Sequence, residues 1–262
     1  MGKNISQRNK FYFISDAHLG MHPVEESRKR EKKLVRWLDT IKDDAAELFL
    51  VGDIFDFWHE HKHVVPKGFV RFLGKLAELS DIGVKIHFFS GNHDIWVYGY
   101  FKEELNIDIY HKPIVRIING NKFLIGHGDG VGKGDYAYKL LKWCFRNKTL
   151  QWLFSRLHPN CSMWIGKTWS KHSRYSKGIV AEGFSDREFQ IIYAKDVLKE
   201  EHYDYFIFGH RHIPYDLKLA ENSRIINLGD WIYSYTYAEF DGLQLKLEQF
   251  EGNGSGIMKG GA

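Results

Sequence analysis

The chain has little cysteine and no long apolar run. Cys144 and Cys161 are the two cysteines among 262 residues, and they form neither a Cys-x-x-Cys pair nor a zinc-type spacing. We therefore expect no disulfide scaffold, and a reducing compartment is the simpler interpretation. No stretch of eighteen consecutive apolar residues occurs, so the pattern predicts no transmembrane helix. The sequence indicates a soluble or membrane-peripheral protein.

Three common motifs are also missing. The first strand is expected to begin near Lys10, which leaves no apolar segment for a signal peptide. The glycine-rich stretch 126–134 fails the P-loop spacing, because His127 stands where a glycine is required. No Gly-x-Ser-x-Gly occurs, so no nucleophile elbow is indicated. We expect a cytoplasmic protein whose chemistry uses neither a P-loop nor a nucleophile elbow.

The composition is that of a globular protein with an uneven distribution of charge. Apolar residues make up 44% and aromatic residues 16% of the chain, enough for a sizeable core. The net charge of +4 hides a basic segment from Lys133 to Lys177, where ten Lys and Arg face a single acid, Asp135. This segment also holds four of the eight tryptophans. Such a surface calls for an anionic partner.

Apolar runs and helical patterns alternate in the first part of the chain. Strands are expected at 10–15, 47–51 and 84–89, with helices over about 25–42 and 67–80 between them. This order predicts a mainly parallel core sheet.

The second part of the chain is richer in short β segments. An Asn-Gly turn at 119–120 predicts a hairpin of 114–118 and 122–125. A helix over 185–200 would begin with Ser185 as N-cap and Glu188 completing a capping box. Further strands are expected at 205–208, 215–219, 224–228, 232–239 and 243–249. The Gly- and Ser-rich tail, 251–262, is expected to be disordered.

Five of the expected strands end in residues that bind metal ions. In open α/β sheets, ligands collect beyond the carboxyl ends of strands, and residues two apart on an extended chain point to the same side. The candidate ligands are Asp16 and His18, Asp53, Asn92, His127, and His210 with His212. Imidazoles and carboxylates without thiolates suit Mn, Fe, Zn or Co. Seven ligands exceed the needs of one ion and fit two, with Asp53 as the natural bridge.

Each motif taken alone can also be explained without any function. A single Asp-x-His or Gly-Asn-His-Asp is common in ordinary turns, and His210 with His212 could be surface residues. The whole series in this order makes coincidence implausible. By contrast, we interpret His59, His61 and His63 as solvated residues of a polar loop rather than as a metal cluster.

These motifs resemble those of the calcineurin-like metallophosphoesterases. The resemblance covers residues 16–212 and implies an α/β fold, a four-layer αββα sandwich of two mixed sheets. It implies that one metal is held by Asp16, His18, Asp53 and His212, and the other by Asp53, Asn92, His127 and His210. The expected cofactor is a pair of divalent ions, Mn2+ above all. A catalytic role is expected for His93, held by Asp94, which would bond the phosphoryl group or protonate the leaving oxygen.

Several stretches are similar to one subfamily, the pyrophosphatases that act on UDP-2,3-diacylglucosamine in lipid A synthesis. These are 15–20, 52–58, 127–129 and 227–231, together with the long insertion after His127. The resemblance implies a core of 10–132 and 178–250, and an inserted helical lid, 133–177, that clasps the acyl chains. Candidate substrate contacts are Asn92, Tyr138, Lys167, Lys171 and Lys177.

The lid sequence agrees with contact to a lipid. Leu150, Leu153, Phe154 and Leu157 form an apolar stripe beside basic residues. Basic residues with tryptophan are typical of a helix at an anionic membrane surface, so a peripheral location on the cytoplasmic face of the inner membrane is expected. The alternative is that the stripe packs the lid onto the core.

Other functions stay open on the sequence alone. The best-known branch of the subfamily has Arg where this chain has His93, as general phosphoesterases do. The alternatives are another phosphoesterase acting on nucleotides or phosphodiesters, and a catalytically silent scaffold. Nucleic-acid binding through the basic segment is a weaker idea. No obligate protein partner is expected.

Overall fold

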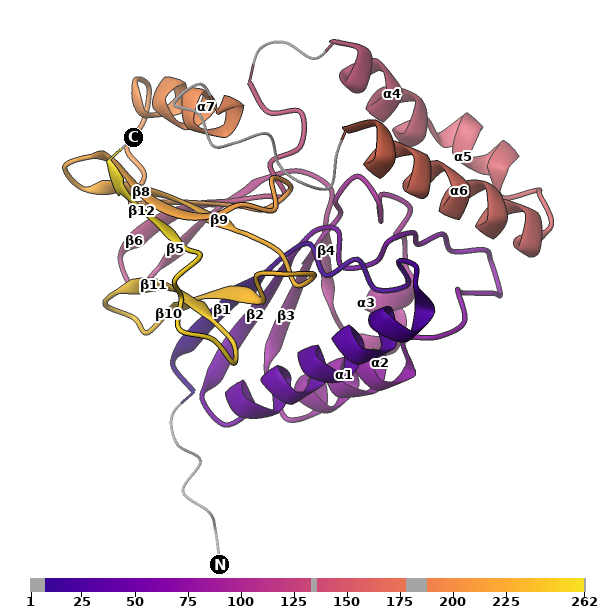
Figure 1. Ribbon diagram of the computed structural model, residues 1–262, viewed down its shortest axis with the longest axis horizontal. Coiled ribbons are helices and arrows are strands. Elements are labelled where there is room, and N and C mark those ends of the chain that lie inside the picture. The colour runs from indigo at the N-terminus through magenta and orange to yellow at the C-terminus, as the bar shows by residue number, and fades with distance from the viewer. Residues whose placement is uncertain (1–7, 133–135, 178–187, 262) are drawn as a thin grey trace, which may run out of the picture.

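Two six-stranded sheets face one another in this computed structural model, which describes residues 8–132, 136–177 and 188–261 (Figure 1). Helices cover the outer face of each sheet. Both sheets contain parallel and antiparallel neighbours, so the predicted αββα sandwich of two mixed sheets is confirmed.

The first sheet has the order β11-β10-β1-β2-β3-β4. Its parallel part comprises β1 (Lys10–Ile14), β2 (Ala45–Val51), β3 (Lys85–Phe89) and β4 (Asp108–Tyr110). An antiparallel edge is added by β10 (Thr236–Phe240) and β11 (Leu245–Gln249). Its outer face carries α1 (Val24–Ile41), α2 (Val70–Asp81) and α3 (Tyr100–Leu105). The expected βαβαβ order is confirmed.

The second sheet has the order β12-β8-β9-β7-β6-β5. The predicted hairpin is β5 (Ile114–Ile118) with β6 (Asn121–Ile125). Parallel pairing joins β6 to β7 (Tyr205–Phe208) and β7 to β9 (Ser223–Leu228). The remaining strands are β8 (Pro214–Ala220) and β12 (Met258–Gly261), and α7 (Phe189–Leu198) packs on the outer face.

The central strands are apolar on both faces because both faces are buried. Along β2, Leu48 and Leu50 pack toward the α1–α2 layer, whereas Phe49 and Val51 enter the core between the sheets. The Phe13 and Phe49 rings stack there at 4.6 Å between centroids. This two-sided burial fixes the strand ends, and therefore the residues that follow them.

Two expectations about the second part of the chain are wrong. The last core helix begins at Phe189, and Glu188 occupies the N-cap position without a side-chain cap. The Glu188 carboxylate binds Arg211 instead, at 2.7 Å, and Ser185 lies outside the described residues. The tail is not disordered throughout, because Met258–Gly261 forms β12, which pairs in parallel with β8.

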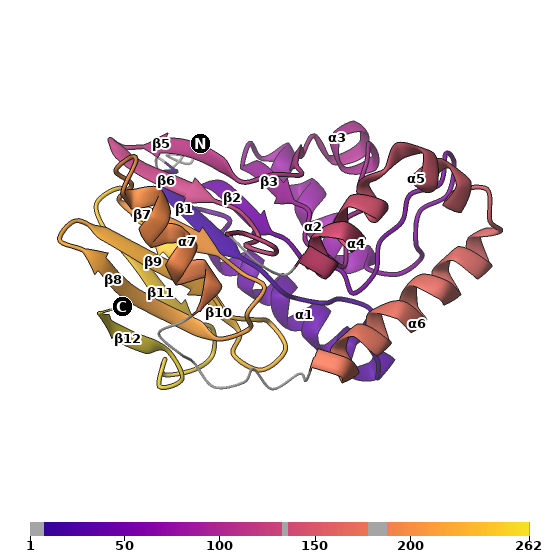
Figure 2. The ribbon, with the colours of Figure 1, turned by 90° about the horizontal axis from the view of Figure 1, so that it is seen from above.

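The basic segment folds into three helices beside the carboxyl ends of the strands (Figures 1 and 2). These are α4 (Tyr136–Arg146), α5 (Lys148–Phe154) and α6 (Pro159–Lys177). We call these three helices the lid, after the expectation from the sequence. The Trp96 indole N–H donates a hydrogen bond to the Phe145 carbonyl and connects them to the rest of the chain. Among the described residues, no helix is both long and apolar enough to cross a membrane.

Candidate metal centre

All five strand-end motifs meet at one place. Asp16 and His18 follow β1, Asp53 follows β2, and Asn92 with His93 follows β3. The other sheet contributes His127 after β6, and His210 with His212 after β7. Parallel strands end at a common edge of each sheet, which is why residues up to 196 positions apart converge here.

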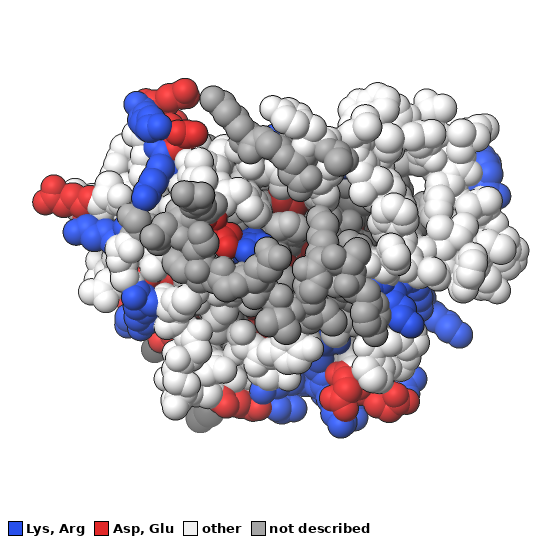
Figure 3. Space-filling model, turned by 45° about the horizontal axis from the view of Figure 1, so that its top comes forward, with Lys and Arg blue, Asp and Glu red and all other residues white. Residues whose placement is uncertain are grey.

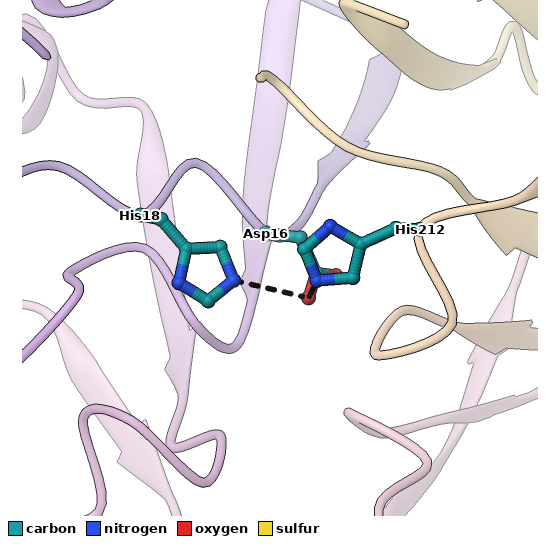
Figure 4. A group of neighbouring side chains, drawn as sticks. All are labelled: Asp16, His18 and His212. Atoms are coloured by element: carbon teal, nitrogen blue, oxygen red, sulfur yellow. Dashed lines mark ion pairs between the residues drawn. The ribbon is translucent and has the colours of Figure 1, made fainter. Parts of the chain in front are cut away.

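The first group of donors consists of Asp16, His18 and His212 (Figure 4). Asp16 Oδ1 lies 3.8 Å from His18 Nε2 and 3.3 Å from His212 Nε2. Asp16 and His18 are buried, yet Asp16 Oδ1 and His18 Nε2 have no hydrogen-bond partner in the described part of the chain. Buried polar atoms without partners are rare in proteins, and a cation between them would satisfy them.

The second group consists of Asp53, His127 and His210. His127 Nε2 lies 3.3 Å from Asp53 Oδ2 and 3.3 Å from Asn92 Oδ1. Asp53 also lies 3.8 Å from His18 Nε2, through its Oδ2 atom. Asp53 thus belongs to both ends of the cluster, as a bridging carboxylate must.

The backbone around these ligands leaves no room for larger residues. A Cβ atom on Gly91 would collide with Asp53 Oδ1, and one on Gly52 would lie 2.5 Å from His127 Nδ1. Asp16 and Asp53 themselves adopt left-handed conformations, with φ of 53° and 52°. Such conformations cost free energy and persist where the surroundings enforce them, as at functional sites.

Charges within the cluster shift its pKa values strongly. Burial would lower the pKa of His127, but the Asp53 carboxylate outweighs it and raises the value to about 10. Burial would likewise raise the pKa of Asp16, but His212 and His18 hold it at about 2. At His210, burial and the nearby His127 lower the pKa to about 4. Bound divalent ions would supply the positive charge that protons on the imidazoles supply here, since imidazole ligands bind metal ions in the deprotonated form.

Outer acids orient two of the imidazoles. Asp56 Oδ1 lies 3.6 Å from His18 Nδ1, and Asp230 Oδ2 lies 3.4 Å from His212 Nδ1. Partners of this kind fix the ring orientation of metal-binding histidines. Asp56 and Asp230 are not among the ligands expected from the sequence, although they lie in the stretches 52–58 and 227–231 that carry the subfamily resemblance.

The expected pairing of His93 with Asp94 is wrong. The Asp94 carboxylate accepts backbone N–H groups of the Asp53 loop, including Ile54 at 2.8 Å, and the N–H of Gly91 in its own loop at 2.7 Å. It braces the loop rather than an imidazole, and burial with the Asp53 charge raises its pKa to about 7. His93 Nδ1 instead lies 2.8 Å from Ser170 Oγ on α6.

The expected substrate residues Tyr138, Lys167 and Lys171 have different surroundings in the structure. Tyr138 donates a hydrogen bond to Asp129, and its ring centroid is 6.4 Å from that of His210. Lys167 and Lys171 line a cavity that also includes Asp56. Lys177 ends α6, but its side chain lies outside the described part of the chain.

An apolar cavity of about 270 Å3 separates the lid from the core beside the metal centre. Asn92 and His93 line one end of it. The rest is mainly apolar and aromatic, including Phe57, Ile95, Trp96, Phe145, Leu150, Phe154, Ile165 and Trp169. The apolar residues of α5 therefore divide: Phe154 faces this cavity, whereas Leu153 is 52% exposed.

The interpretation of the three loop histidines as solvated is wrong for His59. Its side chain is buried between Trp96 and Phe154, because the lid covers the loop. Neither ring nitrogen has a hydrogen-bond partner among the described residues, and burial together with His61 lowers the pKa to about 4. His61 Nε2 lies 3.0 Å from Ser162 Oγ of the lid, and His63 is exposed.

The fold and the cluster together define a class, the dinuclear metal-dependent hydrolases. Seven N and O donors at the edge of an αββα sandwich fit two divalent ions, which would polarise a phosphoryl oxygen and lower the pKa of a water molecule. The chain belongs to the calcineurin-like phosphoesterase family, whose model matches residues 9–214.

Two relatives align with most of the chain. A UDP-2,3-diacylglucosamine hydrolase of Porphyromonas gingivalis is 38% identical over 258 residues, covering 93% of this chain and 98% of the relative. A UDP-2,3-diacylglucosamine hydrolase of Histophilus somni is 27% identical over 228 residues, covering 85% and 92%. Among solved structures, the phosphoesterase YfcE of E. coli matches with 13% identity, 92% coverage of both chains and a TM-score of 0.45.

Proposed function

We propose that this chain hydrolyses the pyrophosphate of UDP-2,3-diacylglucosamine, giving 2,3-diacylglucosamine 1-phosphate and UMP. The observation that carries the proposal is the apolar cavity beside the metal cluster. Asn92 and His93 line this cavity, and they also lie beside the candidate ligands: Asn92 Oδ1 is 3.3 Å from His127 Nε2, and His93 is grouped with His18 and Asp53. A lipid-linked pyrophosphate requires an apolar cavity next to a metal cluster, because its acyl chains would occupy the cavity while its anhydride lies at the cluster. The 38% identity to a relative with this activity in its name supports the substrate.

The reaction consumes only water. A water oxygen forms a bond to one phosphorus, the bridging P–O bond breaks, and the bridging oxygen leaves with the other phosphate. His93 is placed to donate a hydrogen bond to the phosphoryl group or a proton to the leaving oxygen, with its ring held by Ser170 and the Asp56 carbonyl. Asn92 and Tyr138 contact the substrate near the second ion, and Lys167, Lys171 and Lys177 are proposed to act on its phosphates.

The two ions are proposed to be Mn2+. One would be held by Asp16, His18, Asp53 and His212, and the other by Asp53, Asn92, His127 and His210. Hard carboxylate and amide oxygens beside imidazoles suit this ion, and the described cluster has no thiolate. Activity restored to metal-free protein by Mn2+, and less well by Zn2+ or Mg2+ at equal concentration, is the expected result.

The lid, 133–177, is proposed to bring the enzyme to an anionic membrane on the cytoplasmic side, while 10–132 and 178–250 form the catalytic core. Large apolar side chains of the lid are exposed, among them Leu140 at 63%, Trp143 at 62% and Trp164 at 70%. Figure 3 shows the lid face as largely uncharged, with Lys and Arg gathered below it. Sedimentation with anionic vesicles should fall for Trp143→Ala/Trp164→Ala; unchanged sedimentation would reject this membrane role.

The decisive assay compares two substrates with one Mn2+-loaded protein. We expect UMP release from UDP-2,3-diacylglucosamine with a kcat/KM well above that for bis(p-nitrophenyl) phosphate. Equal or better turnover of the generic phosphodiester, or of a nucleic acid, would reject the lipid substrate in favour of a general phosphoesterase.

A further inference from the structure

A second cavity, of about 360 Å3, shares Asp56 with the apolar cavity and is lined by other residues of α6. The start of α1, α6 of the lid and the loop at 232–235 form its walls. Its lining has two acids, Glu26 and Asp56, and five cations: Lys29, Arg30, Lys33, Lys167 and Lys171. We call it the basic cavity. This excess of positive charge predicts an anionic occupant.

Arg30 links the basic cavity to the metal centre. Its side chain is buried, with 6% of the residue exposed, and Nη2 lies 3.4 Å from the backbone carbonyl of His18. Its Nε atom has no hydrogen-bond partner among the described residues. A buried guanidinium with an unused donor is costly unless a ligand completes it. Phosphate oxygens match the planar donors of Arg.

Two tyrosines give the basic cavity an aromatic wall. Tyr233 is 66% exposed, and the Lys33 Nζ atom lies 3.5 Å from the ring centroid of Tyr235. Asp230 holds this loop by accepting the backbone N–H groups of Ile232, Tyr233 and Ser234, and it also contacts His212. The wall is therefore fixed relative to a metal ligand. An exposed aromatic ring beside lysines suits a planar base attached to a phosphate.

We propose that the basic cavity binds the nucleoside monophosphate half of the substrate, with its phosphate on the cations and its base on the tyrosines. The inference rests on the proposed function and adds the location of the nucleotide. Asp56 lines both cavities, so the scissile bond lies between them. The acyl half then extends under the lid, and the nucleotide half extends toward α1.

A third cavity, of about 230 Å3, lies near His127 and is the rival location. It is lined by three Lys and Arg residues, against five in the basic cavity. Cations are paired in both: Lys142 with Asp129 and Arg146 with the carbonyl of His111 here, and Lys29 with Glu26 and Lys33 with Glu251 in the basic cavity. Lys112, which also lines this cavity and is exposed, provides a matched control for charge reversal.

The test is calorimetric binding of UMP, uridine and inorganic phosphate to Mn2+-loaded protein. Tyr233→Ala and Lys167→Glu change exposed residues of the basic cavity, and each should weaken UMP binding by about tenfold or more, the loss of one stacking or ionic contact. Lys112→Glu should leave UMP binding within about twofold of wild type. Circular dichroism and Mn2+ content verify that each variant folds and loads its metals.

The outcomes are distinct. Unchanged UMP binding in both basic-cavity variants, or a greater loss in Lys112→Glu, overturns the proposal. Equal affinity for UMP and phosphate, with no effect of Tyr233→Ala, also overturns it by leaving only an anion site. If UMP binding responds as expected but the UDP-linked lipid is not hydrolysed, the nucleotide site stands and the proposed function fails.

Discussion

Asp53 is the residue on which the proposed metal centre depends, because it belongs to the second group of donors and also lies 3.8 Å from His18 of the first. In Asp53→Asn the bridging charge is lost, so we expect the Mn2+ content to fall from two ions to one or fewer and phosphohydrolase activity to disappear. Metal analysis of the purified variant checks this. Asp81→Asn, which removes an exposed acid at the end of α2, is the control and should keep both ions. Full loading and full activity in Asp53→Asn would refute the bridge.

His59 is a neutral imidazole buried under the lid, and it makes stability depend on pH. Its native pKa is lowered to about 4 by burial and the nearby His61, against about 6.5 in the unfolded chain. As pH falls from about 6.5 toward 4, the unfolded state gains a proton that the native state does not, so stability is lost. The loss through His59 is on the order of 2 kcal/mol at pH 5.

His59→Phe should remove this dependence while filling the same apolar space. Thermal unfolding of both proteins from pH 7.5 to 5 measures it, and the advantage of the wild type should shrink or reverse as pH falls. His63→Phe, at an exposed position of the same loop, serves as the control. Parallel curves for wild type and His59→Phe would contradict the assignment of His59 as a buried neutral group.

At the scale of elements, the lid helix α6 crosses the core very closely at Gly166. A Cβ atom there would overlap the ring of Phe57, which lines the apolar cavity. Ala in place of Gly normally stabilises a helix by about 1 kcal/mol. We expect the opposite in Gly166→Ala, with the lid displaced and the KM for the lipid substrate raised. Gly74→Ala in α2 adds a Cβ with no atom within 4 Å, so it should stabilise the protein.

The strands, the paired helices and the convergence of the candidate ligands could be predicted because they depend on local patterns. Phe49 and Val51 sit in an apolar run that only a strand buried on both faces explains. The misses all involve contacts between distant segments. Arg211 forms an ion pair with Glu188, the glycine-rich β12 pairs with β8, and the lid buries His59. Asp94 was expected to pair with His93 because the two are adjacent in sequence. Its carboxylate instead accepts hydrogen bonds from backbone N–H groups of the Asp53 loop, such as that of Ile54.

At the scale of the whole molecule, both sheets contribute residues to one cluster, so metal binding should hold the sheets together. A ligand at 100 times its dissociation constant stabilises the native state by about 2.7 kcal/mol, or about 5–10 °C in Tm for a domain of this size. Removal of metal with EDTA should therefore lower Tm by several degrees and abolish activity. Both should return with Mn2+, and an unchanged Tm would show that the cluster does not couple the sheets.

The most direct test of the account is anomalous X-ray scattering at the manganese edge from crystals of the Mn2+-loaded, active protein. We predict two peaks, one on each side of the Asp53 carboxylate, with His18 and His212 beside one and His127 and His210 beside the other. Active protein with no peak, or with a single peak away from Asp53, would contradict the account.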